Sequence, residues 1–331
     1  MEFNKSKYAH LSILEKQKYI KVIKDEFEKQ LAKHLSLTRV SAPLLVTKES
    51  GLQDDLTGVE RKVSFDIKKN GKEIEIVQSL AKWKRMALKK YGFKLHKGLY
   101  TDMLAIRRDD EMDEMHSIYV DQWDWEKVIE KKDRRLKYLQ DTVKKIVKAI
   151  VKTSEKVKKL GFSGVELCED IHFVDSQELL DMYPGKSSKE REYLITKKYK
   201  TVFILKIGDN LSDGLPHDKR APDYDDWALN GDLLFYHEVL DAPIEISSMG
   251  IRVDAKSMLE QLKKSQKMER ADYEFHKAVL SGELPLSIGG GIGQSRLCML
   301  MLGRAHIGEV QASYWDDENL ITCKKLGIEL L

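Results

Sequence analysis

A hairpin signal at residues 63–77 constrains the fold of this chain more than any other stretch. In VSFDIKKNGKEIEIV, apolar residues occupy alternate positions on both sides of Asn70-Gly71, a dipeptide that strongly favours a tight turn between antiparallel strands. Other strand-like stretches follow without regularly alternating helices, and they lie at 38–47, 98–107, 116–128, 201–207, 232–239 and 242–253. This order predicts an α+β fold in which a mostly antiparallel central β-sheet is flanked by helices.

Two long amphipathic segments are predicted to be helices. Residues 8–35 repeat apolar side chains with a helical period, and so does the lysine-rich stretch 127–159. The lysines fall on the polar face, which favours a solvated helix face over an RNA-binding stripe, while a docking site for a partner helix stays open. Shorter helices are expected at 80–92, 255–267 and 270–280, the first of them ending at Gly92.

Bulk properties narrow the class of protein. The 331 residues carry a net charge of +3 from 57 basic and 54 acidic residues, which is a mixed surface and not the basic footprint of a nucleic-acid binder. No Pro/Gly/Ser linker divides the chain, so a single domain over 1–331 is expected. No apolar run approaches the ~18 residues needed to cross a bilayer, so no membrane partner is expected. Three cysteines without a CxxC pair indicate a reducing, cytoplasmic setting.

Residues 287–296, SIGGGIGQSR, concentrate glycine in one short run. The run fails the dinucleotide-binding fingerprint, because Gln294 or Arg296 stands where the third glycine belongs. PGKSS at 184–188 also fails the P-loop pattern, since Leu180 replaces the first glycine. A glycine loop feeding a helix with Arg296 in its first turns suits an adenine nucleotide and its phosphates. Close packing of a glycine-rich strand end is an equally good interpretation of this run alone.

Polar side chains on successive strands suggest a concave polar site. In VDQWDW, Gln122 and Asp124 point to the same side of a strand, which is typical of a face that binds a small polar ligand. In IEISSMGIR, strand alternation places Glu245 and Ser247 on one face and Ser248 on the other. Carboxylates on such strands are ordinary at a surface, but their oxygens also suit Mg²⁺ bound to phosphate.

Several long segments, in order along nearly the whole chain, resemble the asparagine synthetase A family of ammonia-dependent aspartate–ammonia ligases. The segments are QDDLTG (53–58), SLAKWKR (79–85), GLYTDMLAIR (98–107), HSIYVDQWDWE (116–126), IHFVDSQELL (171–180), LSDGLPHDKRAPDYDDW (211–227), LNGD (229–232), EISSMGIR (245–252) and GGGIGQSR (289–296). The family's fold is similar to the catalytic core of class II aminoacyl-tRNA synthetases. The resemblance implies one catalytic domain over 1–331, with the helix at 8–35 packing on or extending the core and no anticodon-binding domain.

The resemblance also implies the reaction. The side-chain carboxylate of aspartate would attack the α-phosphate of ATP to give β-aspartyl-AMP and diphosphate, and ammonia would then displace AMP to give L-asparagine. Adenylation is needed because a bare carboxylate is too poor an electrophile for ammonia. Aspartate, ammonia and ATP are then the expected partners, with Mg²⁺ as the metal, no tRNA, and a cytoplasmic homodimer as the expected assembly.

Roles follow position by position from the same resemblance. Arg107 would bind the α-phosphate and the reacting carboxylate, Arg296 would bind the outer phosphates, and Asp54 would orient or deprotonate ammonia. Asp232 and Glu245 would hold Mg²⁺. The implied ATP site comprises Arg107, Asp232, Glu245, Gly289, Gly290, Gly291, Gly293 and Arg296. The implied aspartate site comprises Lys84, Gln122, Asp124, Asp225, Ser247, Ser248 and Arg252, with Gln122 also counted as catalytic.

Free ammonia is the expected nitrogen donor on separate grounds. Glutamine-dependent amide synthesis needs a nucleophilic cysteine, typically the residue exposed after Met1 is removed, and position 2 here is Glu2. Cys298 lies inside an apolar helical run, where it is expected to be a small buried hydrophobe. Two alternatives stay open: a truncated synthetase paralogue that adenylates an amino acid for another acceptor, and a non-catalytic amino-acid or nucleotide sensor.

Overall fold

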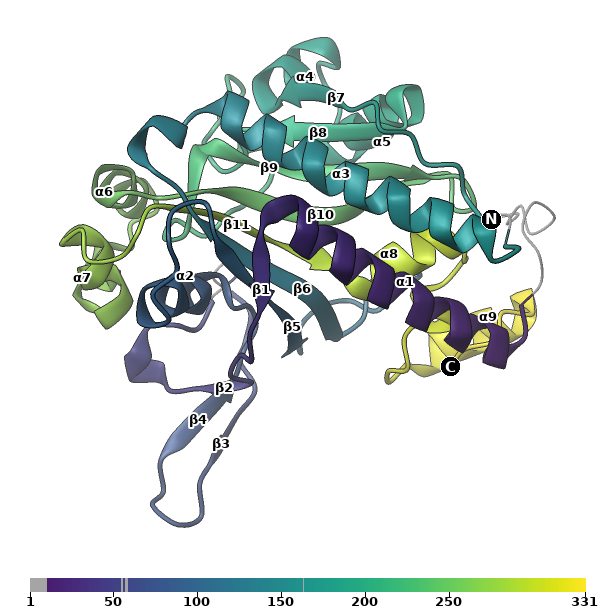
Figure 1. Ribbon diagram of the computed structural model, residues 1–331, viewed down its shortest axis with the longest axis horizontal. Helices are drawn as coiled ribbons and strands as arrows, with labels where there is room; N and C mark the ends of the chain where they lie inside the picture. Colours follow the sequence, from purple (N-terminus) through teal and green to yellow (C-terminus); the bar gives the residue numbers. More distant parts are fainter. Residues whose placement is uncertain (1–10, 55, 57–58, 163) are drawn as a thin grey trace.

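An eight-stranded sheet forms the centre of the part of the chain that the computed structural model describes, which is residues 11–54, 56, 59–162 and 164–331. Its strand order is β1-β5-β6-β11-β10-β9-β8-β7 (Figure 1). The glycine-rich strand β11 therefore lies in the interior of the sheet, between β6 and β10. The strands are β1 Leu37–Arg39, β5 Gly98–Ile106, β6 Tyr119–Val128, β7 His172–Asp175, β8 Thr201–Leu205, β9 Asp225–His237, β10 Ala242–Arg252 and β11 Ser287–Gly293.

This sheet is mixed, which corrects the prediction of a mostly antiparallel one. The inner neighbours from β5 to β8 pair antiparallel, whereas β1 runs parallel to β5 and β7 runs parallel to β8. Parallel neighbours need a crossover connection, and α4 (Ser176–Met182) and α5 (Ser188–Tyr199) provide it between β7 and β8. Neither helix is among those predicted from the sequence, although both begin with a capping box that the sequence displays as DSQE and SSKE.

The predicted hairpin is confirmed. β3 (Ser64–Asp66) pairs antiparallel with β4 (Glu73–Ile76), and Gly71 between them has a φ of 65°, which glycine adopts without strain. β2 (Leu45–Val46) joins the other edge of β4, and this three-stranded sheet projects from the main body (Figure 1). The single strand predicted at 38–47 is thus divided between β1 and β2, which belong to different sheets.

Two long helices, α1 (Ile13–Leu35) and α3 (Leu136–Lys159), lie side by side across one face of the main sheet (Figure 1). The ring of Phe27 on α1 lies 4.7 Å from that of Trp123 on β6, inside the largest apolar cluster. The α3 lysines lie outward as predicted. The predicted first helix began at residue 8, whereas α1 begins after a Ser12 capping box, and residues 8–10 lie outside the described part.

The glycine run is itself a strand and not a loop, which corrects the expectation of a glycine loop feeding a helix. α8 (Gln294–Leu302) follows β11 directly and packs against α1 on the same face. α2 (Ala81–Lys90) packs on the opposite face and, as predicted, is followed by Gly92 with a φ of 67°. None of the described helices is long and apolar enough to cross a bilayer. The remaining helices are α6 Ala255–Lys264, α7 Glu274–Leu280 and α9 Asp317–Leu326.

Candidate active site

A cavity of about 620 Å³ opens on the face of the main sheet opposite α1 and α3. Side chains alternate along β6, so Trp123 packs against α1 while Gln122 and Asp124 point into the cavity, as predicted. The predicted site residues that line the cavity are Asp54, Lys84, Arg107, Gln122, Asp124, Asp225, Glu245, Ser248, Arg252, Gly290, Gly291, Gly293 and Arg296. Three others lie behind its wall, and they are Asp232, Ser247 and Gly289.

One end of the cavity carries charges that are already paired. Lys84 on α2 places its Nζ 3.1 Å from Asp124 Oδ2. Arg252 on β10 donates to Glu126 Oε2 over 2.7 Å and to Asp225 Oδ1 over 2.5 Å. The side chains of these five residues are at most 3% exposed. We call them the ion-paired end.

The ion-paired end holds three carboxylates against two cations, so it carries a net negative charge that suits a substrate ammonium group. Burial raises the pKa of Asp225, although the neighbouring Arg252 opposes this shift. Burial also lowers the pKa of Lys84, and Asp124 counteracts it. In both groups desolvation outweighs the attraction within the pair, so each pKa moves toward favouring the uncharged form, and the ion pairs only limit that shift.

The glycines of β11 make room for these carboxylates. β11 pairs with β6 so that Gly289 lies opposite Glu126 and Gly291 lies opposite Asp124. A Cβ added at Gly289 would overlap the Glu126 carboxylate and stand 2.7 Å from Arg252 Nη2, and one at Gly291 would stand 2.7 Å from Asp124 Oδ1. Gly289 is therefore covered by an ion pair and is not among the residues that line the cavity, although the resemblance implied that it belongs to the ATP site.

A β-bulge in β10 decides which of its polar residues reach the cavity. Glu245 pairs with Leu234 and Ser247 pairs with Leu233, so one extra residue shifts the alternation between them. As a result Glu245 and Ser248 line the cavity, whereas Ser247 faces away and its Oγ donates to the carbonyl oxygen of Gly291 over 2.8 Å. The prediction that Glu245 and Ser247 share a face was wrong, because simple alternation does not reveal a bulge.

The other end of the cavity carries arginines with open donor groups. Arg107 follows β5 and its Nε donates to the carbonyl oxygen of Gln78 over 3.3 Å. Arg296 lies in the first turn of α8, and its Nη1 donates to the carbonyl oxygen of Glu245 over 3.1 Å. Neither guanidinium forms an ion pair with a carboxylate in the described part of the chain. We call Arg107 and Arg296 the arginine end; it has the charge and the donors to bind phosphate.

A buried carboxylate lies next to the cavity wall. Asp232 on β9 forms an ion pair with Arg220, which lines the cavity together with Glu245. Burial and the charge of Glu245 raise the pKa of Asp232, and Arg220 opposes the shift. Asp232 Oδ1 is buried and has no hydrogen-bond partner among the described residues. Asp232 and Glu245 thus offer oxygen ligands of the kind that Mg²⁺ prefers, including one oxygen that the protein leaves unsatisfied.

Asp54 lies in the segment between β2 and β3, which forms part of the cavity wall. Its Oδ1 accepts a hydrogen bond from the backbone N–H of Leu56 over 2.9 Å. Asp54 lines the cavity, and its Oδ2 is buried and has no hydrogen-bond partner among the described residues. Asp54 therefore presents a carboxylate oxygen that is available to a nitrogen nucleophile.

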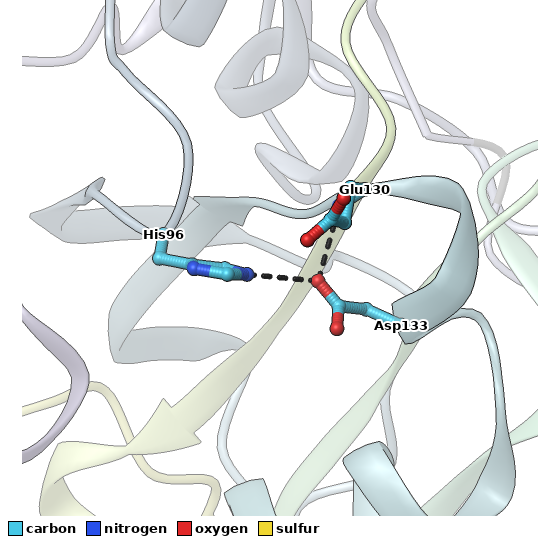
Figure 2. A group of neighbouring side chains, drawn as sticks. All are labelled: His96, Glu130 and Asp133. Atoms are coloured by element: carbon cyan, nitrogen blue, oxygen red, sulfur yellow. Dashed lines mark hydrogen bonds and ion pairs between the residues drawn. The ribbon is translucent and has the colours of Figure 1, made fainter.

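A histidine and two carboxylates gather away from the cavity, at η3 (Lys131–Asp133). Ligand atoms of His96, Glu130 and Asp133 lie within 4.8 Å of one another (Figure 2). Asp133 Oδ2 already accepts from His96 Nε2 over 2.8 Å and from the backbone N–H of Glu130, and Lys132 pairs with Glu130 over 2.7 Å. These contacts cap η3 and use the same oxygens that a metal would need, so we assign the cluster a structural role.

Sequence reasoning missed two residues that shape the cavity. Glu126 holds Arg252 in place, and Arg220 pairs with Asp232. Glu126 could have been found, because it continues the alternation of Gln122 and Asp124 along β6. Arg220 lies in a segment without strand or helix periodicity, where no local pattern indicates the direction of its side chain.

The chain is similar to known proteins over almost its whole length. Residues 14–327 match the family model described as aspartate-ammonia ligase. The aspartate–ammonia ligase of Bacillus cytotoxicus is 57% identical over 322 residues, which is 97% of this chain and 98% of the relative. The aspartate–ammonia ligase of Clostridium perfringens is 56% identical over 323 residues, which is 97% of this chain and 96% of that relative. These full-length matches do not favour a truncated synthetase paralogue or a sensor.

Solved structures show the same fold at low sequence identity. Asparaginyl-tRNA synthetases from Entamoeba histolytica and Pyrococcus horikoshii, each in complex with asparaginyl-adenylate, align with a TM-score of 0.60 and identities of 14% and 15%. The alignments cover 89% of this chain and 66% and 68% of those chains. The fold is thus that of the class II synthetase catalytic core, and the chain belongs to the aspartate–ammonia ligase family.

Proposed function

We propose that this protein makes L-asparagine from L-aspartate, ammonia and ATP, and that it releases AMP and diphosphate. The observation that carries the proposal is one cavity whose ion-paired end suits an amino acid and whose arginine end suits phosphates. The family to which the chain belongs supports this assignment. We extend the proposal to a single catalytic domain over 1–331 that works as a homodimer in the cytoplasm.

Aspartate would lie with its α-ammonium group toward the ion-paired end. The excess carboxylate charge there attracts the ammonium, and the Gln122 amide supplies a donor and an acceptor beside it. This placement directs the β-carboxylate toward the arginine end. Holding both reactants in one orientation removes much of the entropic barrier to their reaction.

In the first step, an oxygen of the β-carboxylate bonds to the α-phosphorus of ATP. The bond from that phosphorus to the bridging oxygen breaks, and diphosphate leaves with the electron pair. Arg107 and Arg296 neutralise the negative charge that builds on the phosphates, a contribution that is large in a site with little water. Asp232 and Glu245 would hold Mg²⁺, which when bound supplies further positive charge to the phosphate oxygens.

In the second step, the nitrogen of ammonia attacks the activated carbonyl carbon. AMP leaves with the electron pair of the anhydride bond, and the nitrogen loses one proton, for which the Asp54 carboxylate would be the acceptor. Glutamine is not the expected donor. Cys298 is buried in α8, and burial raises the pKa of its thiol to about 12, so it does not supply a thiolate nucleophile.

The test is an assay of the purified protein with ATP, Mg²⁺, L-aspartate and ¹⁵N-ammonium. We expect asparagine with the label in its side-chain amide, and AMP formed in equal amount. Replacing ammonium by glutamine should abolish the product. Asparagine formation from glutamine, or no dependence on either nitrogen source, would contradict the proposal.

A further inference from the structure

A buried ion cluster lies behind Asp54, outside the cavity. Its centre is Asp223, two residues before β9, and its Oδ2 is contacted by three donors. Lys82 Nζ lies at 3.0 Å, Arg270 Nη1 at 2.9 Å and His276 Nε2 at 3.0 Å. All four side chains are at most 7% exposed, and none lines the cavity. None of these four residues has a role in the reaction steps proposed above.

Lys82 connects this cluster to the segment that carries Asp54. Its Nζ also donates to the carbonyl oxygen of Gln53 over 3.0 Å. The Gln53 side chain is fixed as well, because its Oε1 accepts the backbone N–H of Gln78 over 2.9 Å and that of Asp54 over 3.2 Å. Its Nε2 donates to the carbonyl oxygen of Ile76 over 2.8 Å. Main chain and side chain of Gln53 are thus both held directly beside Asp54.

The charges in the cluster are strongly coupled. Burial alone would raise the pKa of Asp223, but Lys82, His276 and Arg270 together lower it far below its ordinary value. A buried ion pair contributes little net stability compared with apolar side chains of the same volume, yet it fixes geometry through directional contacts. The geometry it fixes here is that of residues 53 and 54, on one side, and of the start of β9, on the other.

We infer that the ion pair between Lys82 and Asp223 positions Asp54 for the nitrogen nucleophile, so that these two buried residues govern the use of ammonia. The inference rests on the proposed function. Lys82 and Asp223 are positioning residues, since they act through Gln53 and touch no substrate. Lys84, two residues along α2, instead contacts Asp124 at the ion-paired end. One helix therefore supports the amino-acid site and the nitrogen site through separate side chains.

The test separates the two half-reactions in Lys82→Met. Adenylation is measured without ammonium, as aspartate-dependent exchange of labelled diphosphate into ATP, and amide formation is measured as kcat/KM for ammonium. We expect the exchange rate to be unchanged and kcat/KM for ammonium to fall about 10- to 100-fold, the loss that a small misplacement of a reacting group causes. Lys89→Met is the matched control, because Lys89 lies on the same helix in an exposed pair with Glu283.

A double-mutant cycle with Asp54→Asn adds a readout that a merely structural role would not move. If Lys82 acts through Asp54, then Lys82→Met should lower kcat/KM for ammonium much less in the Asp54→Asn background than in the unaltered protein. Additive losses would overturn the inference, and so would unchanged ammonium use or an equal fall in exchange and amide formation.

Asp223→Asn serves as the second variant if Lys82→Met does not fold, because it keeps the shape of the side chain. The same selective loss is expected from it. Failure of both variants to fold would assign the pair to stability and overturn the inference. An unaltered protein that makes no asparagine would instead refute the proposed function, so the two failures are distinguishable.

Discussion

The two ends of the cavity use charge in opposite ways. At the ion-paired end, the cations Lys84 and Arg252 are buried and bound to carboxylates of the protein. At the arginine end, Arg107 and Arg296 are partly exposed and donate to backbone carbonyl oxygens. Both ends border one cavity, so the fold places cations that are paired with carboxylates beside cations that are not.

The difference indicates which charges serve the fold and which serve ligands. A buried cation that loses its carboxylate, or the reverse, leaves an uncompensated charge in a medium that solvates it poorly. A partly exposed arginine keeps its hydration and can exchange water for phosphate oxygens. Substitutions at the ion-paired end should therefore act first on stability, and substitutions at the arginine end should act first on ATP.

The largest effect on folding is expected for Arg252→Leu. This change leaves Glu126 and Asp225 buried without their cation, which should lower the free energy of unfolding by about 3–5 kcal/mol. Urea unfolding followed by circular dichroism measures it. Arg252→Lys keeps the positive charge but not the guanidinium that donates to both carboxylates. It should therefore lower the free energy of unfolding by less than Arg252→Leu does. A loss below about 1 kcal/mol for Arg252→Leu would mean that the buried carboxylates of Glu126 and Asp225 do not depend on Arg252 for charge compensation.

The largest effect on catalysis without loss of fold is expected for Arg296→Ala. Removing one group that stabilises developing charge should lower kcat/KM for ATP about 10²- to 10³-fold. The free energy of unfolding should change by no more than about 0.5 kcal/mol, as at most surface positions. Steady-state kinetics and urea unfolding on the same preparation give both numbers. A large loss of stability with normal ATP kinetics would place Arg296 among the structural residues.

A smaller effect is expected from Gly289→Ala, with Gly293→Ala as its control. The new methyl group at residue 289 would overlap the Glu126 carboxylate, whereas at residue 293 it would stand 3.3 Å from Arg296 Cβ, a tight contact that a shift of a few tenths of an ångström relieves. We expect Gly289→Ala to lower the free energy of unfolding by about 1–3 kcal/mol. Equal unfolding curves for the two variants would contradict the placement of the Glu126 carboxylate over Gly289.

The smallest effect is expected from a pair outside the cavity. Burial would raise the pKa of Asp133, but hydrogen bonds from His96 and from the Glu130 backbone lower it below its ordinary value. A carboxyl whose folded pKa is depressed stabilises the fold above its unfolded pKa, near 3.9, and this stability is lost as the pH falls through the folded pKa.

Asp133→Asn should therefore lower stability at neutral pH by less than about 1 kcal/mol, because His96 is exposed. The difference from the unaltered protein should vanish in acid unfolding experiments at low pH. A difference that grows as the pH falls from 6 to 3 would contradict the depressed pKa of Asp133.

Local patterns of the sequence predicted the features that depend on neighbouring residues. The hairpin around Asn70-Gly71, the end of α2 shortly before Gly92 and the shared face of Gln122 and Asp124 all follow from turn chemistry or from periodicity. Each of these features is decided within a few residues of chain. The alternation of Gln122 and Asp124 predicted the direction of the β6 side chains, which form one wall of the cavity.

The features that sequence reasoning missed depend on distant partners. Arg252 meets Glu126 across 126 residues of chain, and no local pattern pairs them. The bulge in β10 moves Ser247 away from the cavity because β9 and β10 pair out of simple register. The glycine run is a strand because β6 and β10 pair with it on both sides. Its glycines then leave room for the carboxylates on the neighbouring strand, a role that composition alone does not distinguish from nucleotide binding.

The central claim is that the side-chain carboxylate of aspartate attacks the α-phosphorus of ATP. Aspartate labelled with ¹⁸O in its β-carboxylate tests this most directly, with mass spectrometry of the nucleotide and phosphate products. If the account is correct, one ¹⁸O atom appears in the phosphate of AMP and diphosphate carries none. Label in inorganic phosphate formed together with ADP would show attack at the γ-phosphorus and would contradict the adenylate mechanism.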